Sequence, residues 1–115
     1  MPSAIRVLRP PAWCCAVLLA VLSLLPAEEM VRTGVDGRLE HGIAYAGTAF
    51  LFGMSYPDWG WKRPAAGLVI YAAVLEVLQT FSPGRHPAAE DWLAGSAGVL
   101  LGIGAAIRAD NLWRQ

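Results

Sequence analysis

The chain of 115 residues is 56% hydrophobic and only 16% charged, and its nine basic and nine acidic residues cancel. A soluble domain usually has about 45 to 50% apolar and about 25% charged residues, and a domain near this size leaves roughly a third of its chain surface in water. This composition disfavours a soluble globule, a basic nucleic-acid-binding face and a highly charged disordered chain, and it favours residence in a membrane.

Four apolar blocks, taken in chain order, predict the organisation. They are Ala12–Leu25, Gly42–Tyr56, Ala65–Phe81 and Trp92–Ile107. A spanning helix needs about 17 to 25 mostly apolar residues, so the blocks alone are short. The first can extend from Pro11 to Ala27, and the fourth can begin at Pro87, because proline suits the first helical turn. The sequence therefore predicts an all-α integral membrane bundle of four transmembrane helices with short loops, in a single domain over residues 1–115.

Two alternatives compete with this interpretation. The first block can be a signal peptide, since Arg6 and Arg9 precede an apolar stretch and Ala27 could end at a cleavage site. Against it, Leu25 would occupy a position where signal peptides have a small residue. The four blocks could also form a soluble helical bundle, but most of them lack a polar stripe at helical spacing.

The basic residues predict the orientation of the four helices. With both termini inside, the inner side collects six (Arg6, Arg9, Lys62, Arg63, Arg108, Arg114) and the outer side three (Arg32, Arg38, Arg85). The positive-inside rule therefore predicts an N-in, C-in topology. Trp59 and Trp61 beside Lys62 are then either an inner interface belt or ordinary packing residues.

Candidate functional residues lie at the predicted outer ends of the helices. His41 and Tyr45 are four residues apart and share one helix face, as do Glu76 and Gln79, three apart. An ionisable residue at the centre of a span costs about 2.5 to 3.5 kcal/mol and marks a functional site by default. Glu76 is therefore a candidate, and the alternative is a carboxyl that only packs, neutral or paired, against a neighbouring helix.

The connection between the third and fourth blocks adds a cation. Pro83 and Gly84 suit the central positions of a type II turn, which would hold Arg85 near the outer helix ends. From there Arg85 is expected to pair with Glu76 or Asp91. Asp91 can also be explained as a carboxylate at the positive end of a helix dipole.

A stripe of small residues follows in the fourth block. Ala94, Gly98 and Gly102 repeat every four residues, a spacing that lets helix backbones approach closely. This stripe is expected to pack either within the fold or between copies of the chain, so self-association through it is one prediction.

Two ordered motifs resemble the signature of the VanZ-like family of small bacterial membrane proteins. The longer is Glu76-x-x-Gln79-x-Phe81-x-Pro83-Gly84-Arg85, followed by Asp91, Gly98 and Gly102. The other is Arg38-x-x-His41-x-x-Ala44-Tyr45, with Gly47 soon after. Together they cover about residues 36–102. The chain departs from the family pattern at four positions: Gly37 stands where an Asp is usual, Asp36 is one position early, Ala88 replaces a Ser and Gly95 replaces an Asn.

The resemblance implies a multi-pass protein of the bacterial cytoplasmic membrane. The founding member of the family is associated with reduced susceptibility to the glycopeptide teicoplanin, and most relatives have no assigned activity. An outward-facing cluster would then lie where cell-wall precursors and glycopeptides are found. The residues of this candidate polar cluster are His41, Tyr45, Glu76, Gln79, Arg85 and Asp91.

Three functions follow for the cluster. In the first, Arg85 binds a phosphate or carboxylate of a lipid, cell-wall precursor or glycopeptide. In the second, the protein is a membrane enzyme acting on a lipid-linked substrate, with His41 and Glu76 or Asp91 as acid and base. In the third, the cluster only holds the helices together. Binding is favoured over catalysis, because no nucleophile motif is visible, and no cofactor, metal-spaced ligand set or nucleic-acid partner is predicted.

Overall fold

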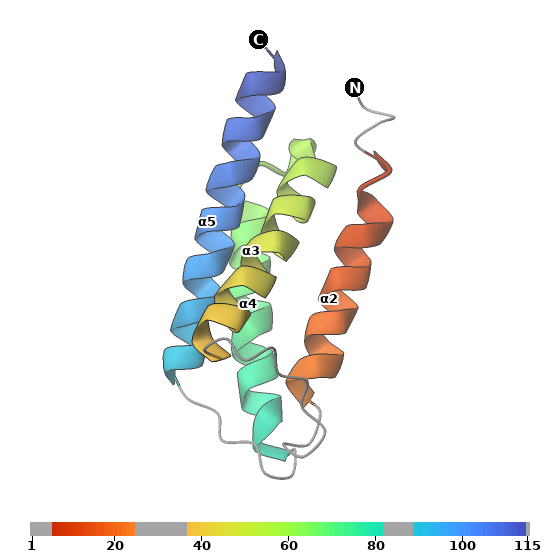
Figure 1. The fold of residues 1–115 in the computed structure, drawn as a ribbon. Coiled ribbons are helices and arrows are strands. Elements are labelled where there is room, and N and C mark those ends of the chain that lie inside the picture. Colours follow the sequence, from red (N-terminus) through yellow and green to blue (C-terminus); the bar gives the residue numbers. More distant parts are fainter. Residues whose placement is uncertain (1–5, 25–36, 82–88, 115) are drawn as a thin grey trace.

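The computed structural model describes residues 6–24, 37–81 and 89–114, which form four long helices running alternately up and down (Figure 1). The helices are α2 (Arg9–Leu24), α3 (Gly37–Ser55), α4 (Lys62–Leu78) and α5 (Ala89–Arg114). Short 3-10 turns, η2 (Pro57–Trp59) and η3 (Gln79–Phe81), precede and follow α4. The described residues contain no strand, so the predicted all-α fold of four helices is confirmed.

Two helices extend beyond the apolar blocks that predicted them. α3 begins at Gly37 rather than Gly42, and α5 continues past Ile107 to Arg114. Acidic residues occupy the first turns of both helices, where they interact favourably with the exposed backbone amides of the helix N-terminus. Polar turns can therefore be helical, and an apolar block marks only the least polar part of a helix.

Fewer helices than predicted meet the requirements of a membrane span. By length and composition only two segments are long and apolar enough, Lys62–Phe81 and Ala89–Leu112. α2 has 16 residues, about 24 Å of helix rise against a hydrocarbon core of about 30 Å. α3 has 19 residues but carries Arg38, Glu40 and His41 in its first turns. The prediction of four helices is thus confirmed. Among the described residues, however, only two of these helices are long and apolar enough to span a membrane.

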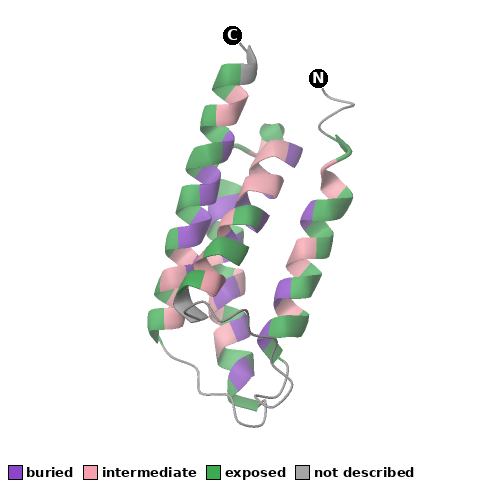
Figure 2. Ribbon diagram, viewed as in Figure 1, coloured by how far each residue is buried: buried purple, intermediate pink, exposed green. Residues whose placement is uncertain are grey.

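The apolar segments of α4 and α5 are only partly covered by protein. Of the most apolar window in each, 33% is buried inside the fold. Figure 2 shows buried positions on the sides of the helices that face one another, with exposed positions on their outer sides. A core helix of a soluble protein would be mostly buried, so these two helices present apolar surface outward.

The closest helix packing joins α3 and α5, which run parallel (Figure 1). A Cβ atom added at Gly98 would overlap the Gly42 carbonyl oxygen, and one at Gly102 would overlap the Ala46 carbonyl oxygen. The two backbones are therefore in direct contact, as small residues allow. The stripe of Ala94, Gly98 and Gly102 packs within the chain, which is one of its two expected roles. Self-association through the same residues stays a prediction.

Polar bonds attach α2 to the rest of the bundle. The Tyr71 hydroxyl of α4 donates a hydrogen bond to the Ala16 carbonyl oxygen, and Arg9 Nε donates to the Ser55 carbonyl oxygen at 3.0 Å. The buried apolar residues of α2 are few, with Ala12 and Leu19 belonging to the common core. α2 is therefore held by hydrogen bonds at discrete points as well as by packing.

Charge separates the two ends of the bundle. The end that carries residue 6 and residue 114 is called here the basic end, and its described charged side chains are Arg6, Arg9, Lys62, Arg63 and Arg108, with Asp58 and Asp110. At the opposite end, called here the acidic end, the charged residues whose side chains the structure describes are Glu40, Glu76, Glu90 and Asp91. The basic end is the one that the positive-inside rule assigns to the inside.

The contact between α3 and α5 gives a first prediction. Gly98→Ala is expected to lower the free energy of unfolding by about 2 kcal/mol or more, because the new methyl group must push the two backbones apart. The measurement is unfolding in mild detergent, followed by circular dichroism as a denaturing detergent is added. Gly104→Ala is the control, because a Cβ there meets no atom within 4 Å, and its unfolding energy should be unchanged or slightly higher. Equal effects of the two substitutions would contradict the packing described.

Candidate functional site

His41 and Tyr45 form the centre of the predicted polar cluster, near the acidic end of α3. Their ring centroids are 5.2 Å apart with planes tilted by 41°, so the prediction that they share a helix face is confirmed. Both rings pack against α5 at Gly95, where an added Cβ would lie 3.2 Å from Tyr45 Cδ2 and 3.3 Å from His41 Cδ2. Gly95 of α5 therefore lies against both rings, with no side chain of its own between them.

The Tyr45 hydroxyl is the unusual atom of the site. Tyr45 is fully buried, and its hydroxyl makes no hydrogen bond within the part of the chain that the structure describes. Tyr71 and Glu76 of α4 lie close enough to act on it electrostatically. Buried hydroxyls are nearly always hydrogen-bonded, and leaving one unpaired costs about 1 to 3 kcal/mol. Because Tyr45 is fully buried, a ligand or water can pair with this hydroxyl only where the helices around it separate.

Gln79 takes part in helix packing at the same end of the bundle. It is buried in η3, and its Nε2 donates a hydrogen bond to the Ser23 carbonyl oxygen at 2.9 Å. This bond ties the end of α4 to the last turn of α2. Gln79, which was predicted to share a helix face with Glu76, thus attaches this end of α4 to α2.

The remaining predicted site residues lie on or before α5. Asp91 is half-buried in the first turn of α5, one turn before Gly95 and therefore on the side that meets His41 and Tyr45. Arg85, the type II turn at Pro83 and Gly84, and Ala88 lie outside the described residues. The structure thus brings His41 and Tyr45 together, puts Asp91 on the adjoining face of α5, and leaves Glu76 on α4 within electrostatic range of Tyr45.

The described groups of this cluster are suited to hydrogen bonding and charge interactions. Among residues 6–24, 37–81 and 89–114, no group of three or more His, Cys, Asp or Glu side chains is placed to hold a metal ion. The groups present are an imidazole, a phenol and carboxylates, which bind hydroxyl, amide and ammonium groups. Such a set can orient the polar head of a ligand at the end of the bundle.

The sequence interpretation missed an aromatic cluster at the basic end. Trp13 of α2 meets Phe52 of α3 edge to face at 5.0 Å, and its Nε1 donates to the Tyr56 hydroxyl oxygen at 2.8 Å. Tyr56 in turn stacks on Trp59 at 3.9 Å. Phe52 and Tyr56 are four residues apart, so their shared face could have been predicted. Of the two tryptophans predicted at the inner interface, Trp59 packs in this cluster, whereas Trp61 is half exposed.

The chain matches no family model, no curated protein and no solved structure. The resemblance to the VanZ-like family therefore depends on the motifs of the sequence alone.

The unpaired hydroxyl gives a second prediction. Tyr45→Phe is expected to leave the free energy of unfolding unchanged or to raise it by about 1 kcal/mol, because it removes a buried polar group that has no partner. Tyr71→Phe is the matched comparison, since it deletes a hydroxyl that bonds to Ala16, and it should lower the unfolding energy by about 1 kcal/mol. Both are measured by detergent denaturation. A loss in Tyr45→Phe as large as that in Tyr71→Phe would show that the Tyr45 hydroxyl has a structural partner.

Proposed function

We propose that this chain is a multi-pass protein of the bacterial cytoplasmic membrane, related to the VanZ-like family, whose acidic end faces outward and binds a lipid, cell-wall precursor or glycopeptide. The apolar outer surface supports the membrane location. Ile70 and Val77 of α4 are 62% and 63% exposed, and Leu101 of α5 is 73% exposed. Apolar side chains exposed along the length of helices are stable in a lipid environment and costly in water.

The observation that supports the binding role is the Tyr45 hydroxyl, a buried donor that makes no hydrogen bond among the described residues. A phenol that can donate and a carboxylate that can accept are suited to the hydroxyl and amide groups of a sugar or peptide. His41 packs at a tilt against the same tyrosine ring and adds a second group that can donate or accept. These groups would hold the neutral polar part of the ligand.

Arg85 would add a permanent positive charge to the polar cluster. It lies four residues after Phe81, the end of η3, and four before Ala89, the start of α5. Its guanidinium group would bind the phosphate or carboxylate of the ligand with paired hydrogen bonds.

A structural role for the cluster is the second candidate. The bond from Gln79 to the Ser23 carbonyl favours it, because that side chain already serves to hold helices together. The two roles differ in consequence. A cluster that only holds helices loses protein when it is mutated, whereas a binding site loses ligand while the protein remains.

Topology is the third prediction. Reporter fusions after Arg32 and Arg85 should report the outside, and fusions after Lys62 and Arg114 the inside, because basic residues are retained on the inner side. The measurement is the activity ratio of an externally active and an internally active reporter at each position. A fusion after Lys62 that reports the outside would remove the basis for an external site.

Ligand recognition is the fourth prediction. Tyr45→Phe and Arg85→Ala should each weaken binding of a lipid-linked cell-wall precursor or of teicoplanin by about tenfold or more, at wild-type protein abundance in the membrane. Arg85→Lys should weaken binding less than Arg85→Ala, because the charge remains but the paired donors are lost. Arg108→Ala, at the basic end, is the control and should bind normally. Normal binding of both ligands by Arg85→Ala, or reduced abundance matching every loss of binding, would favour the structural role.

A further inference from the structure

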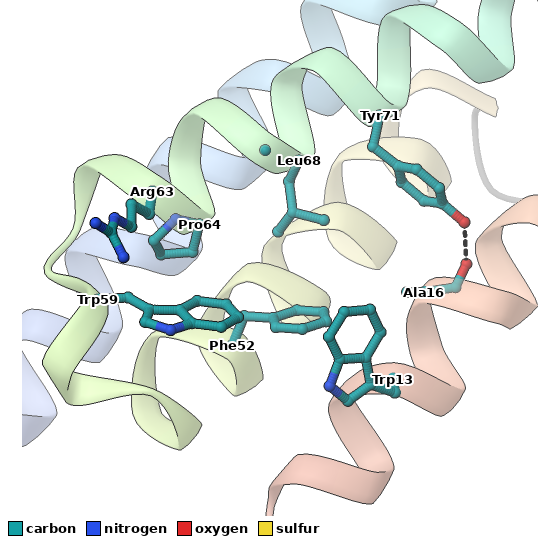
Figure 3. Close-up of a pocket in the computed structure, with 9 residues that line it drawn as sticks. Trp13, Ala16, Phe52, Trp59, Arg63, Pro64, Leu68 and Tyr71 are labelled. Atoms are coloured by element: carbon teal, nitrogen blue, oxygen red, sulfur yellow. Dashed lines mark hydrogen bonds between the residues drawn. The ribbon is translucent and has the colours of Figure 1, made fainter.

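A cavity opens between α2 and α4 toward the basic end, far along the helices from the polar cluster. It has a volume of about 220 Å³, and Figure 3 shows the side chains around it. Residues from three helices and from η2 form its apolar walls: Trp13, Ala16, Phe52, Trp59, Leu68 and Tyr71. Since α2 meets α4 at few points, the space between them is open on one side, and this space is called here the α2–α4 groove.

The α2–α4 groove is open because small residues line it. Ala16 contributes only a methyl group, and Gly67 contributes no side chain. A Cβ added at Gly67 would meet no atom within 4 Å. Above these residues the Tyr71 hydroxyl bonds to the Ala16 carbonyl and holds the two helices at this separation (Figure 3). The groove is therefore a fixed feature of the packing, and side chains that face it lack partner atoms on one side.

The aromatic walls are rigid and present carbon to the interior. Trp13 and Phe52 meet edge to face, and Trp59 is stacked on Tyr56 outside the lining. The one polar atom of Trp13 is already bonded to the Tyr56 hydroxyl. A wall held in this way loses little freedom when it is covered, so an apolar ligand binds at low entropic cost. Because the surface between Trp13 and Tyr71 is almost entirely apolar, the occupant must be apolar along this length.

Positive charge lies at the basic end of the α2–α4 groove. Arg63 is the charged residue of the lining, and Lys62 precedes it at the start of α4. Arg9 lies at the start of α2, with its guanidinium group 4.4 Å from the centre of the Tyr56 ring. A ligand whose apolar part lies in the groove has its other end beside these cations. Binding of such a ligand is stabilised if that end is a negatively charged head group. Basic pockets between helices on the cytoplasmic side of membranes are typical sites for anionic lipid head groups.

We propose that the α2–α4 groove binds one acyl chain of an anionic phospholipid of the cytoplasmic leaflet, whose phosphate is held by Arg63. The acyl chain covers Trp13, Phe52 and Trp59, and the guanidinium group contacts the phosphate with two donors. The inference rests on the membrane location proposed above, but it is independent of the polar cluster at the acidic end.

Lipid retention by the purified full chain tests the proposal. The protein is solubilised in mild detergent, incubated with phosphatidylglycerol or with phosphatidylcholine of the same acyl chains, and examined by native mass spectrometry. Wild-type protein should retain one phosphatidylglycerol, about fivefold more tightly than phosphatidylcholine, as expected for one basic residue near a head group. Arg63→Gln should abolish this preference and still bind both lipids weakly.

A second experiment fills the groove with a larger side chain. Gly67→Leu should weaken binding of both lipids by about tenfold, because the new side chain occupies the space of the acyl chain without a clash. Gly104→Leu is the control, since a Cβ at Gly104 also meets no atom within 4 Å, and it should bind like wild type. Circular dichroism melting establishes that all three variants are folded.

Three results would overturn the proposal. They are equal retention of the two lipids by wild type, unchanged retention in Gly67→Leu, or a dimer or bound peptide that Gly67→Leu removes in place of lipid. A protein that stays soluble and monomeric without detergent would instead contradict the membrane location. A failure of precursor or glycopeptide binding would affect only the polar cluster, so the two proposals fail separately.

Discussion

The structure depends on the direct backbone contact between α3 and α5. Gly98 and Gly102 bring α5 against the Gly42 and Ala46 carbonyls, and no side chain can be inserted there. The same approach continues at Gly95, where it presses α5 onto the rings of α3 and buries Tyr45 completely. Close packing thus buries the Tyr45 ring against the α5 backbone, and the hydroxyl of that ring makes no hydrogen bond to any described residue.

α4 connects the two proposed sites. Glu76 and Tyr71 act on Tyr45 electrostatically, and Tyr71 also bonds to Ala16 and lines the α2–α4 groove. One tyrosine therefore lies between the unpaired hydroxyl on one side and the apolar groove on the other.

The number and type of helices could be predicted because apolar blocks separated by polar segments report directly on burial in lipid or protein. The helix ends could not, since the first turn of α3 and the last turns of α5 are polar and carry no apolar signal. Spacing placed His41 beside Tyr45 correctly, and it grouped Gln79 with Glu76 on one face of the next helix. The partner of Gln79 is the Ser23 carbonyl, and a backbone acceptor has no signature in the sequence. Likewise the glycine stripe indicates a close contact without naming α3 as its partner.

The parallel pairing of α3 with α5 also determines the order in which the fold is completed. The chain is synthesised from the N-terminus, so α3 is made while its main partner does not yet exist, and α4 must cross before α5 can return beside it. In a membrane, α3 would be inserted before α5 is made. Its surface at Gly42 and Ala46 would then stay uncovered until α5 packs against it. The last helix synthesised then closes the core, so a chain interrupted before α5 retains helices but lacks the contact that orders them.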